Sequence, residues 1–236
     1  MPDQDLFGRL RQLLLRKRAA FVACADLGTL PVDTRDGLPR GITIGVALDP
    51  VIVDSLRNGP NAEFDAEYER TSELRKTVGE ACVAFLRAEG LKAATVPGRL
   101  SIPKPGTLSS ALPHKTVATL AGVGWIGKCS LLVTERYGSA VRLVSVLTDA
   151  QLPVGTPVTQ SSCGDCRECV DACPVGALTG QNWQRGMPRK ELFDASACER
   201  WHQQLATSTS CRHAQCYSCV TVCPWTGSYL QSRGQT

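Results

Sequence analysis

Most of the twelve cysteines fall in one stretch near the C-terminus, and their spacing is typical of iron–sulfur ligands. The first group has the sequence Cys163-x2-Cys166-x2-Cys169-x3-Cys173-Pro, and the second has the sequence Cys216-x2-Cys219-x3-Cys223-Pro. A Cys-x2-Cys-x2-Cys run wraps a tight loop, so three thiolates can converge on three corners of one [4Fe–4S] cubane. The pair of groups therefore predicts two such clusters in one small module.

The cysteine that precedes the proline binds the other cluster in two-cluster proteins, so we expect crossed ligation. The predicted ligands of the first cluster are Cys163, Cys166, Cys169 and Cys223. The predicted ligands of the second cluster are Cys173, Cys216, Cys219 and one more distant cysteine, for which Cys198 and Cys211 are both candidates. Structural zinc is the alternative, but zinc sites more often use separated Cys-x2-Cys pairs.

The composition indicates reduced thiols in a cytoplasmic protein. Residues 1–18 carry only a short leucine run between charges, which is not the apolar core of a signal peptide. Disulfides need an oxidising compartment, so we expect reduced thiols. No segment approaches membrane-spanning length, so we expect no membrane partner. The formal charge of +4 falls to about zero if each cluster adds about −2, so the basic balance gives little support for a nucleic-acid partner.

The elements before the cysteines mix helical and strand patterns. Their periodicity predicts helices over 3–18, 63–89 and 115–121, and strands over 19–26, 41–50, 91–97, 129–134 and 140–149. Gly90 is expected to end the long helix, and Cys82 within it is expected to pack in the core. We therefore predict an α/β or α+β domain at 1–155 and a cluster module at 156–236, joined by a Pro/Thr/Ser-rich linker.

The stretch Gly122-Val-Gly-Trp-Ile-Gly-Lys-Cys129 matches two phosphate-binding patterns, but its context is reversed. Both patterns need a strand before them and a helix after them, whereas here a helical segment precedes and an apolar strand follows. We interpret it as a helix end turned by glycines into a strand, or as a wall where backbone approaches a large cofactor. Cys129 is expected to be a packed residue, with a reactive thiol as the alternative.

These motifs together resemble the epoxyqueuosine reductase family and its reductive-dehalogenase relatives. The similar segments are AGVGWIGK (121–128), LTDAQLPVGTPV (147–158), CGDCRECVDACPVGAL (163–178), DASAC (194–198) and CYSCVTVCPW (216–225). The resemblance implies a nitroreductase-like domain that binds base-off cobalamin, followed by a two-cluster ferredoxin-like module that delivers electrons to cobalt. It also implies that Cys198 is the fourth ligand of the second cluster and that Cys211 is a spare thiol.

The resemblance further suggests where the cofactor and the chemistry would lie. The expected cofactor-binding residues are Gly124, Trp125, Ile126, Gly127, Lys128, Ser109 and Ser110. The epoxide reductases of the family carry an acidic residue where this chain has Leu108, and no carboxylate lies between Arg99 and Lys128. Full-length members also continue into a helical-repeat domain that helps to hold tRNA, and this chain stops soon after the last motif. His114 or Lys115 would then have to supply the proton.

The resulting expectation is an enzyme, a cobalamin-dependent iron–sulfur reductase that acts on a small molecule rather than on tRNA. It would take electrons from an external donor of the ferredoxin or flavodoxin type. The main alternative is a non-catalytic electron-transfer protein that reduces a corrinoid or another redox partner. A flavin-dependent reductase ranks last, because no flavin motif is visible in the sequence.

Overall fold

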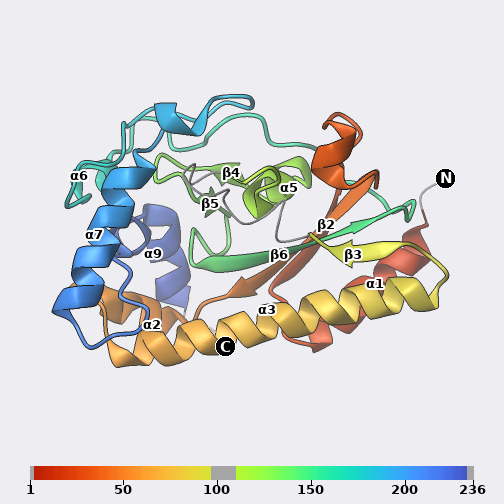
Figure 1. The fold of residues 1–236 in the computed structure, drawn as a ribbon, viewed down its shortest axis with the longest axis horizontal. Helices are drawn as coiled ribbons and strands as arrows, with labels where there is room; N and C mark the ends of the chain where they lie inside the picture. The colour runs from red at the N-terminus through yellow and green to blue at the C-terminus, as the bar shows by residue number, and fades with distance from the viewer. Residues whose placement is uncertain (1–2, 97–109, 233–236) are drawn as a thin grey trace. The chain divides into compact units, whose positions relative to one another are not determined.

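A computed structural model describes residues 3–96 and 110–232 of the chain (Figure 1). The chain forms two compact units that interleave along the sequence. Unit 1 comprises Met1–Ala47, Ser72–Val123 and Arg142–Val158, and unit 2 comprises Leu48–Thr71, Gly124–Val141 and Thr159–Thr236. All the cysteines of the two predicted cluster sets lie in unit 2. The predicted division between residues 155 and 156 into two functional domains stays a prediction.

Unit 1 is built on a four-stranded sheet with the order β1-β2-β6-β3. The strands are β1 (Phe21–Asp26), β2 (Arg40–Ala47), β3 (Ala93–Thr95) and β6 (Val141–Thr148). β1 pairs antiparallel with β2, placing Phe21 opposite Gly45, and β3 pairs antiparallel with β6. Four of the predicted strands are thus confirmed, and the antiparallel pairs favour the α+β form of the predicted mixed fold.

The helices of unit 1 bury an apolar stripe against this sheet. Helix α1 (Gln4–Arg16) begins where the Asp3 side chain accepts a hydrogen bond from the Leu6 N–H, and it buries Leu6, Leu10 and Leu14. Each buried leucine contributes about 1.5–3 kcal/mol. They join a core with residues of β1, β2 and β6, and Cys82 lies in the same core, as predicted. Helix α5 (His114–Leu120) and a short 3-10 turn, η1 (Val32–Arg35), complete the unit.

Helix α3 (Ala62–Ala88) is the long orange-to-yellow helix of Figure 1, and its residues are divided between the two units. It ends as the sequence predicts. Gly90 adopts φ +79°, a left-handed conformation that costs glycine little, and the Leu91 N–H donates to the Leu86 carbonyl oxygen. The predicted helix over 63–89 is therefore confirmed to within a residue at either end.

Unit 2 has little sheet and many short helices. Its elements are α2 (Pro50–Ser55), η2 (Leu56–Asn58), β4 (Trp125–Ile126), β5 (Leu132–Val133), α6 (Glu168–Asp171), η3 (Arg189–Glu191), α7 (Ala195–Ser208), α8 (Ser218–Thr221) and α9 (Pro224–Gln231). β5 lies within the predicted strand over 129–134 but covers only Leu132–Val133, and it pairs antiparallel with β4, which the sequence does not predict. An apolar cluster that includes Leu48, Phe64 and Val220 forms the core of this unit.

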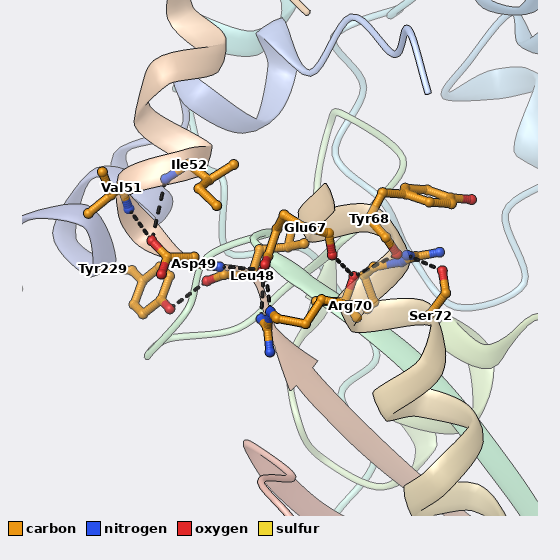
Figure 2. A network of polar contacts seen from close by, with 11 residues as sticks. Leu48, Asp49, Val51, Ile52, Glu67, Tyr68, Arg70, Ser72 and Tyr229 are labelled. Carbon is orange, nitrogen blue, oxygen red and sulfur yellow. Dashed lines mark hydrogen bonds and ion pairs between the residues drawn. The ribbon is translucent and has the colours of Figure 1, made fainter. Parts of the chain in front are cut away.

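A polar network fixes the start of α2 in unit 2 (Figure 2). The Asp49 side chain accepts hydrogen bonds from the N–H groups of Val51 and Ile52, so it caps the helix that Pro50 begins. The buried Glu67 accepts a bond from the Asp49 N–H at 2.8 Å, and it pairs with Arg70 at 2.6 Å. In the sequence, Asp49-Pro50 predicts only the end of a strand, so α2 was missed.

Within the described residues, no helix is long and apolar enough to cross a bilayer.

Candidate metal centre

Four cysteines from two distant segments surround one cavity in unit 2. The cavity has a volume of about 150 Å³ and is lined by Cys163, Cys166, Cys169 and Cys223, together with Lys128, Cys129, Val133, Pro224 and Trp225. These four are the cysteines that the spacing assigns to the first cluster. The structure therefore brings the predicted first set together, including the member that comes from the second half-motif.

Local backbone turns explain how this convergence arises. Cys163 and Cys166 lie in a tight turn closed by a 3.1 Å hydrogen bond from the Cys166 N–H to the Cys163 carbonyl oxygen. Cys169 lies in the single-turn helix α6 that follows. Cys223 is the residue immediately before α9, and Pro224 occupies the first position of that helix, where its missing N–H costs nothing.

The donor set suits a [4Fe–4S] group better than a single ion. Four thiolates around one cavity match the four irons of a cubane. Among the residues that the structure describes, no three His, Cys, Asp or Glu side chains are grouped closely enough to hold a single metal ion. A cubane is larger than one ion and each of its irons takes one thiolate, so a cavity lined by four cysteines fits it.

A second set of cysteines interacts through charge. Burial raises the pKa of Cys198, and the thiols of Cys173 and Cys216 raise it further. Burial also raises the pKa of Cys219 to about 12, with further contributions from Cys169, Cys216, Cys198 and Cys173. These interactions agree with a second set whose members lie near one another and near Cys169 of the first set. Cys211 is not among the largest contributors to either shift.

Helix α7 carries Cys198 into this group, and the sequence alone does not predict that helix. The Asp194 side chain caps it by accepting hydrogen bonds from the N–H groups of Ser196 and Ala197. Cys198 therefore sits in the first turn of the helix, with its sulfur 3.7 Å from His202 Nε2. The Asp-x-Ser sequence before Cys198 is a helix-start signal that could have located the element.

The loop that carries Cys216 is anchored to the first turns of α3 within unit 2. The buried Asp65 accepts hydrogen bonds from the N–H groups of Arg212 at 2.8 Å and His213 at 2.7 Å. Tyr68 stacks on the His213 ring with 3.9 Å between centroids. These contacts hold the loop between α7 and α8 in place. The spacing of residues in the sequence does not predict them.

The glycine-rich stretch has the helix-then-strand order that the sequence predicts. Helix α5 ends at Leu120, and Gly122 then adopts φ +75° while the Val123 N–H donates to the Ala118 carbonyl oxygen. β4 follows, so no helix N-terminus is available to receive a phosphate. A Cβ atom on Gly124 would collide with the Val133 carbonyl oxygen, so that glycine permits close backbone packing within unit 2.

Lys128 and Cys129 adjoin the first set of cysteines. Both are only 5% exposed. Lys128 Nζ donates a 2.9 Å hydrogen bond to the carbonyl oxygen of Cys166. A hydrogen bond from the Cys129 thiol lowers the pKa of Cys169 to about 7 and raises that of Cys129 well above its usual value. The sequence therefore predicts that Cys129 is buried, but it does not predict the interaction with Cys169.

The other residues of the stretch also have neighbours inside the protein. Trp125 is buried and contacts Trp225 edge-on, with 5.0 Å between ring centroids. Ile126 is buried in β4. A Cβ atom on Gly127 would lie 2.7 Å from a methyl carbon of Val133. Residues 124–128 thus have contacts within unit 2, although Trp125 Nε1 is buried without a hydrogen-bond partner among the described residues. Their predicted role in binding a large cofactor stays a prediction.

The predicted proton donors belong to unit 1. His114 Nδ1 lies 3.1 Å from the Ser145 hydroxyl, and burial together with the Arg75 charge lowers the pKa of His114 to about 4. His114 also lines a cavity of about 270 Å³ with Arg75, Lys76 and Glu80.

The other predicted residues of this segment lie close to His114 in the sequence. Lys115 and Ser110 are half-buried. Ser109 and Leu108 lie outside the described residues.

Comparison with known proteins agrees with this geometry. Residues 162–226 match the family described as the 4Fe-4S double cluster binding domain. An epoxyqueuosine reductase of Synechococcus sp. (strain RCC307) is 34% identical over 130 residues, which are 52% of this chain and 38% of that protein. A tetrachloroethene reductive dehalogenase of Desulfitobacterium hafniense is 25% identical over 180 residues, which are 73% of this chain and 31% of that protein.

The chain is similar in sequence to epoxyqueuosine reductases and reductive dehalogenases, and it spans less than half the length of the curated relatives that it matches.

Solved structures show the same fold at lower identity. An epoxyqueuosine reductase bound to a modified tRNA stem loop superposes with a TM-score of 0.64 and 18% identity, covering 95% of this chain and 66% of that one. A catabolic reductive dehalogenase in complex with 3-bromo-4-hydroxybenzoic acid superposes with a TM-score of 0.69 and 16% identity, covering 92% and 31%. The predicted fold class and family resemblance are therefore confirmed.

Proposed function

We propose that this relative of the epoxyqueuosine reductases is an iron–sulfur oxidoreductase that passes electrons through two [4Fe–4S] clusters to a base-off cobalamin. The cobalamin would reduce a small-molecule substrate that is not yet identified. The observation that carries the proposal is the cavity of about 150 Å³ lined by Cys163, Cys166, Cys169 and Cys223. Reduced thiols of this kind agree with a cytoplasmic location.

The ligand assignment follows the crossed pattern. The first cluster would be held by Cys163, Cys166, Cys169 and Cys223, and the second by Cys173, Cys198, Cys216 and Cys219. The electrostatic interaction between Cys169 and Cys219 supports neighbouring clusters, because each of these thiols belongs to a different set. Electrons from an external donor of the ferredoxin or flavodoxin type would then cross a short distance between the two.

The cobalamin part of the proposal is supported by the relatives and not by the glycine-rich stretch. Bound cobalamin would supply a cobalt centre at which the substrate is reduced. Gly124 and Gly127 do not form an open cradle for a corrin ring, because Val133 occupies the space beside both. The Trp125 ring contacts Trp225, and the Lys128 ammonium binds a carbonyl oxygen. We therefore assign no residue of this stretch to the corrinoid.

A substrate other than epoxyqueuosine in tRNA agrees with the proton donors that are present. No carboxylate lies between Arg99 and Lys128. His114 is neutral above about pH 4, so at neutral pH it can donate only the proton of a neutral imidazole. A substrate whose reduction needs no strong acid, or takes its proton from water, fits this environment better than an epoxide does.

The test is to purify the protein anaerobically with its clusters loaded, add cobalamin and remove the unbound corrinoid by gel filtration. We expect about one corrinoid to remain per chain, with the visible spectrum of the base-off form. Protein that holds about eight iron atoms and retains no corrinoid would contradict the cobalamin step while leaving the clusters in place.

The second candidate is an electron-transfer protein that reduces the corrinoid of a partner. The observation that favours it is the protein environment of residues 124–128, all of which have neighbours in unit 2. It predicts redox-active clusters and no retained cofactor. Conversion of a halogenated or epoxide-containing test compound by the isolated protein, with cobalamin and a chemical reductant, would count against this candidate.

A further inference from the structure

Two adjacent side chains that are not cluster ligands stand beside the first cluster site. We infer that Lys128 is the counter-ion of the first cluster and that the Cys129 thiol donates a hydrogen bond to its Cys169 sulfur. Together they hold the first cluster at a higher reduction potential than the second. The inference rests on the proposed cluster ligation, and it assigns to residues 128–129 a role in setting a potential.

Lys128 carries a buried charge that needs a negative partner. Its side chain lines the cavity and is 5% exposed, and its Nζ bonds to the carbonyl oxygen of Cys166. Among the ion pairs found between described residues, none involves Lys128. A buried ammonium without an anion is strongly unfavourable. An oxidised cluster with its four thiolates carries about −2 and would supply the missing charge.

Cys129 places a fifth thiol beside the four ligands. Its side chain lines the same cavity as Cys169 and the other three ligands, and a Cβ atom on Gly127 would lie 3.2 Å from Cys129 Sγ and 3.6 Å from Cys163 Sγ. Cys129 is therefore close to two members of the first set. Since a cubane has four corners and the crossed motif already fills them, the fifth sulfur has a proton to donate and no iron to bind.

The direction of the effect follows from charge. Reduction adds one electron, so the cluster and its thiolates go from about −2 to about −3. A buried cation and a hydrogen bond to a ligand sulfur both stabilise the more negative state, and the potential rises. Near the second set, the positive charge that acts on Cys198 is that of Arg189, whose side chain is exposed and screened by water, and the Glu199 carboxylate opposes it. The first cluster is thus the one on which an electron settles.

The test is a redox titration of the reconstituted protein, followed by electron paramagnetic resonance, with iron analysis of each sample. The variants are Lys128→Met and Cys129→Ala. Their matched controls are Lys190→Met, which removes an exposed lysine, and Cys24→Ala, which removes a buried thiol in unit 1. Lys128→Arg and Cys129→Ser restore the charge and the hydrogen-bond donor.

We expect wild-type protein to show two reduction steps. Lys128→Met and Cys129→Ala should each lower the potential of the upper step and leave the lower step in place. The conservative variants should return it towards the wild-type value, and the controls should not move it. Loss of about four irons in Lys128→Met but not in Lys128→Arg would also support the counter-ion role.

Other outcomes overturn the inference. An unchanged upper step with about eight irons retained would show that neither residue acts on the cluster. Loss of about four irons in Cys129→Ala would identify Cys129 as a ligand instead of a donor. Equal loss of iron in Lys128→Met and Lys128→Arg would show that the positive charge is not what matters, and that Lys128 acts only through its hydrogen bond to the Cys166 carbonyl oxygen. Wild-type protein that assembles no cluster would instead refute the proposed ligation itself.

Discussion

Burial and neighbours divide the cysteines into different chemical kinds. Cys24 and Cys82 lie in the apolar core of unit 1, and burial raises the pKa of Cys24 to about 12, so these thiols pack as small hydrophobic groups. The pKa of Cys169 is instead lowered to about 7, chiefly by a hydrogen bond with the Cys129 thiol. The spacing predicts the ligands of the compact motif, because they are close in sequence. The role of Cys129 depends on a contact with a distant segment, which spacing does not encode.

Cys198 and Cys211 provide a direct test of the second cluster. Cys198→Ser should remove about four of about eight irons, because it deletes one corner of the second cubane. Cys211→Ser should leave the iron content unchanged, since Cys211 is not among the largest charge interactions of the set. Iron and sulfide analysis after anaerobic reconstitution distinguishes the two variants. Loss of iron in Cys211→Ser with full iron in Cys198→Ser would reverse the assignment.

His114 should make the protein less stable in mild acid. Its pKa in the folded state is about 4, whereas an unfolded histidine titrates near 6.5. Between these values the unfolded state binds the extra proton, so stability is full above about pH 6.5 and falls as the pH drops towards 4. From pH 8 to pH 5.5, wild-type protein should lose about 1.4 kcal/mol more than His114→Gln.

The measurement is urea unfolding of both proteins at the two pH values under anaerobic conditions. The difference between wild type and variant cancels the acid sensitivity that other groups share. An equal loss of unfolding free energy in both proteins would show that His114 is protonated as readily in the folded state as in the unfolded chain.

Among the elements, helix α3 is predicted from its periodicity, and its first turns contact the loop that carries Cys216 of the second set. Its periodicity predicts the helix, and Gly90 predicts its end. The function of its first turns is not visible in that pattern, because the partners of Asp65 are backbone N–H groups of Arg212 and His213. The missed helix α2 has only six residues, and α7 has no fully buried residue, so their caps, Asp49 and Asp194, carry more of the signal than an apolar period does.

Removing the Asp65 carboxylate should loosen the loop that carries Cys216. Asp65→Ala leaves two N–H groups without their acceptor and should lower the unfolding free energy by about 2–4 kcal/mol. Asp65→Asn keeps one acceptor oxygen and should lose less. Urea unfolding gives the energy, and the rate of iron loss to a chelator shows whether the second cluster is released first.

Glu69 is the matched control on the same helix. It also contacts Arg212, at 2.9 Å, but both side chains are exposed. Glu69→Ala should therefore cost less than about 1 kcal/mol and leave iron release unchanged. Equal effects of Asp65→Ala and Glu69→Ala would mean that the buried backbone contacts do not anchor the loop.

On the scale of the whole molecule, the two units interleave, which no composition shift in the sequence reveals. The Pro/Thr/Ser-rich segment at 151–162 lies where one segment of unit 1 ends and the last segment of unit 2 begins. The segments 48–71 and 124–141 belong to unit 2 through long-range packing, for which a sequence read in order gives no sign. The fold class and the grouping of Cys163, Cys166, Cys169 and Cys223 around one cavity were predictable, whereas the assembly of unit 2 was not.

The proposed function requires that one chain hold two [4Fe–4S] clusters in crossed ligation. The most direct measurement is Mössbauer spectroscopy of anaerobically prepared protein labelled with iron-57, combined with iron and zinc analysis. We expect about eight irons per chain, all in [4Fe–4S] form, and no stoichiometric zinc. Zinc in place of iron, or about four irons in a single cluster, would contradict it.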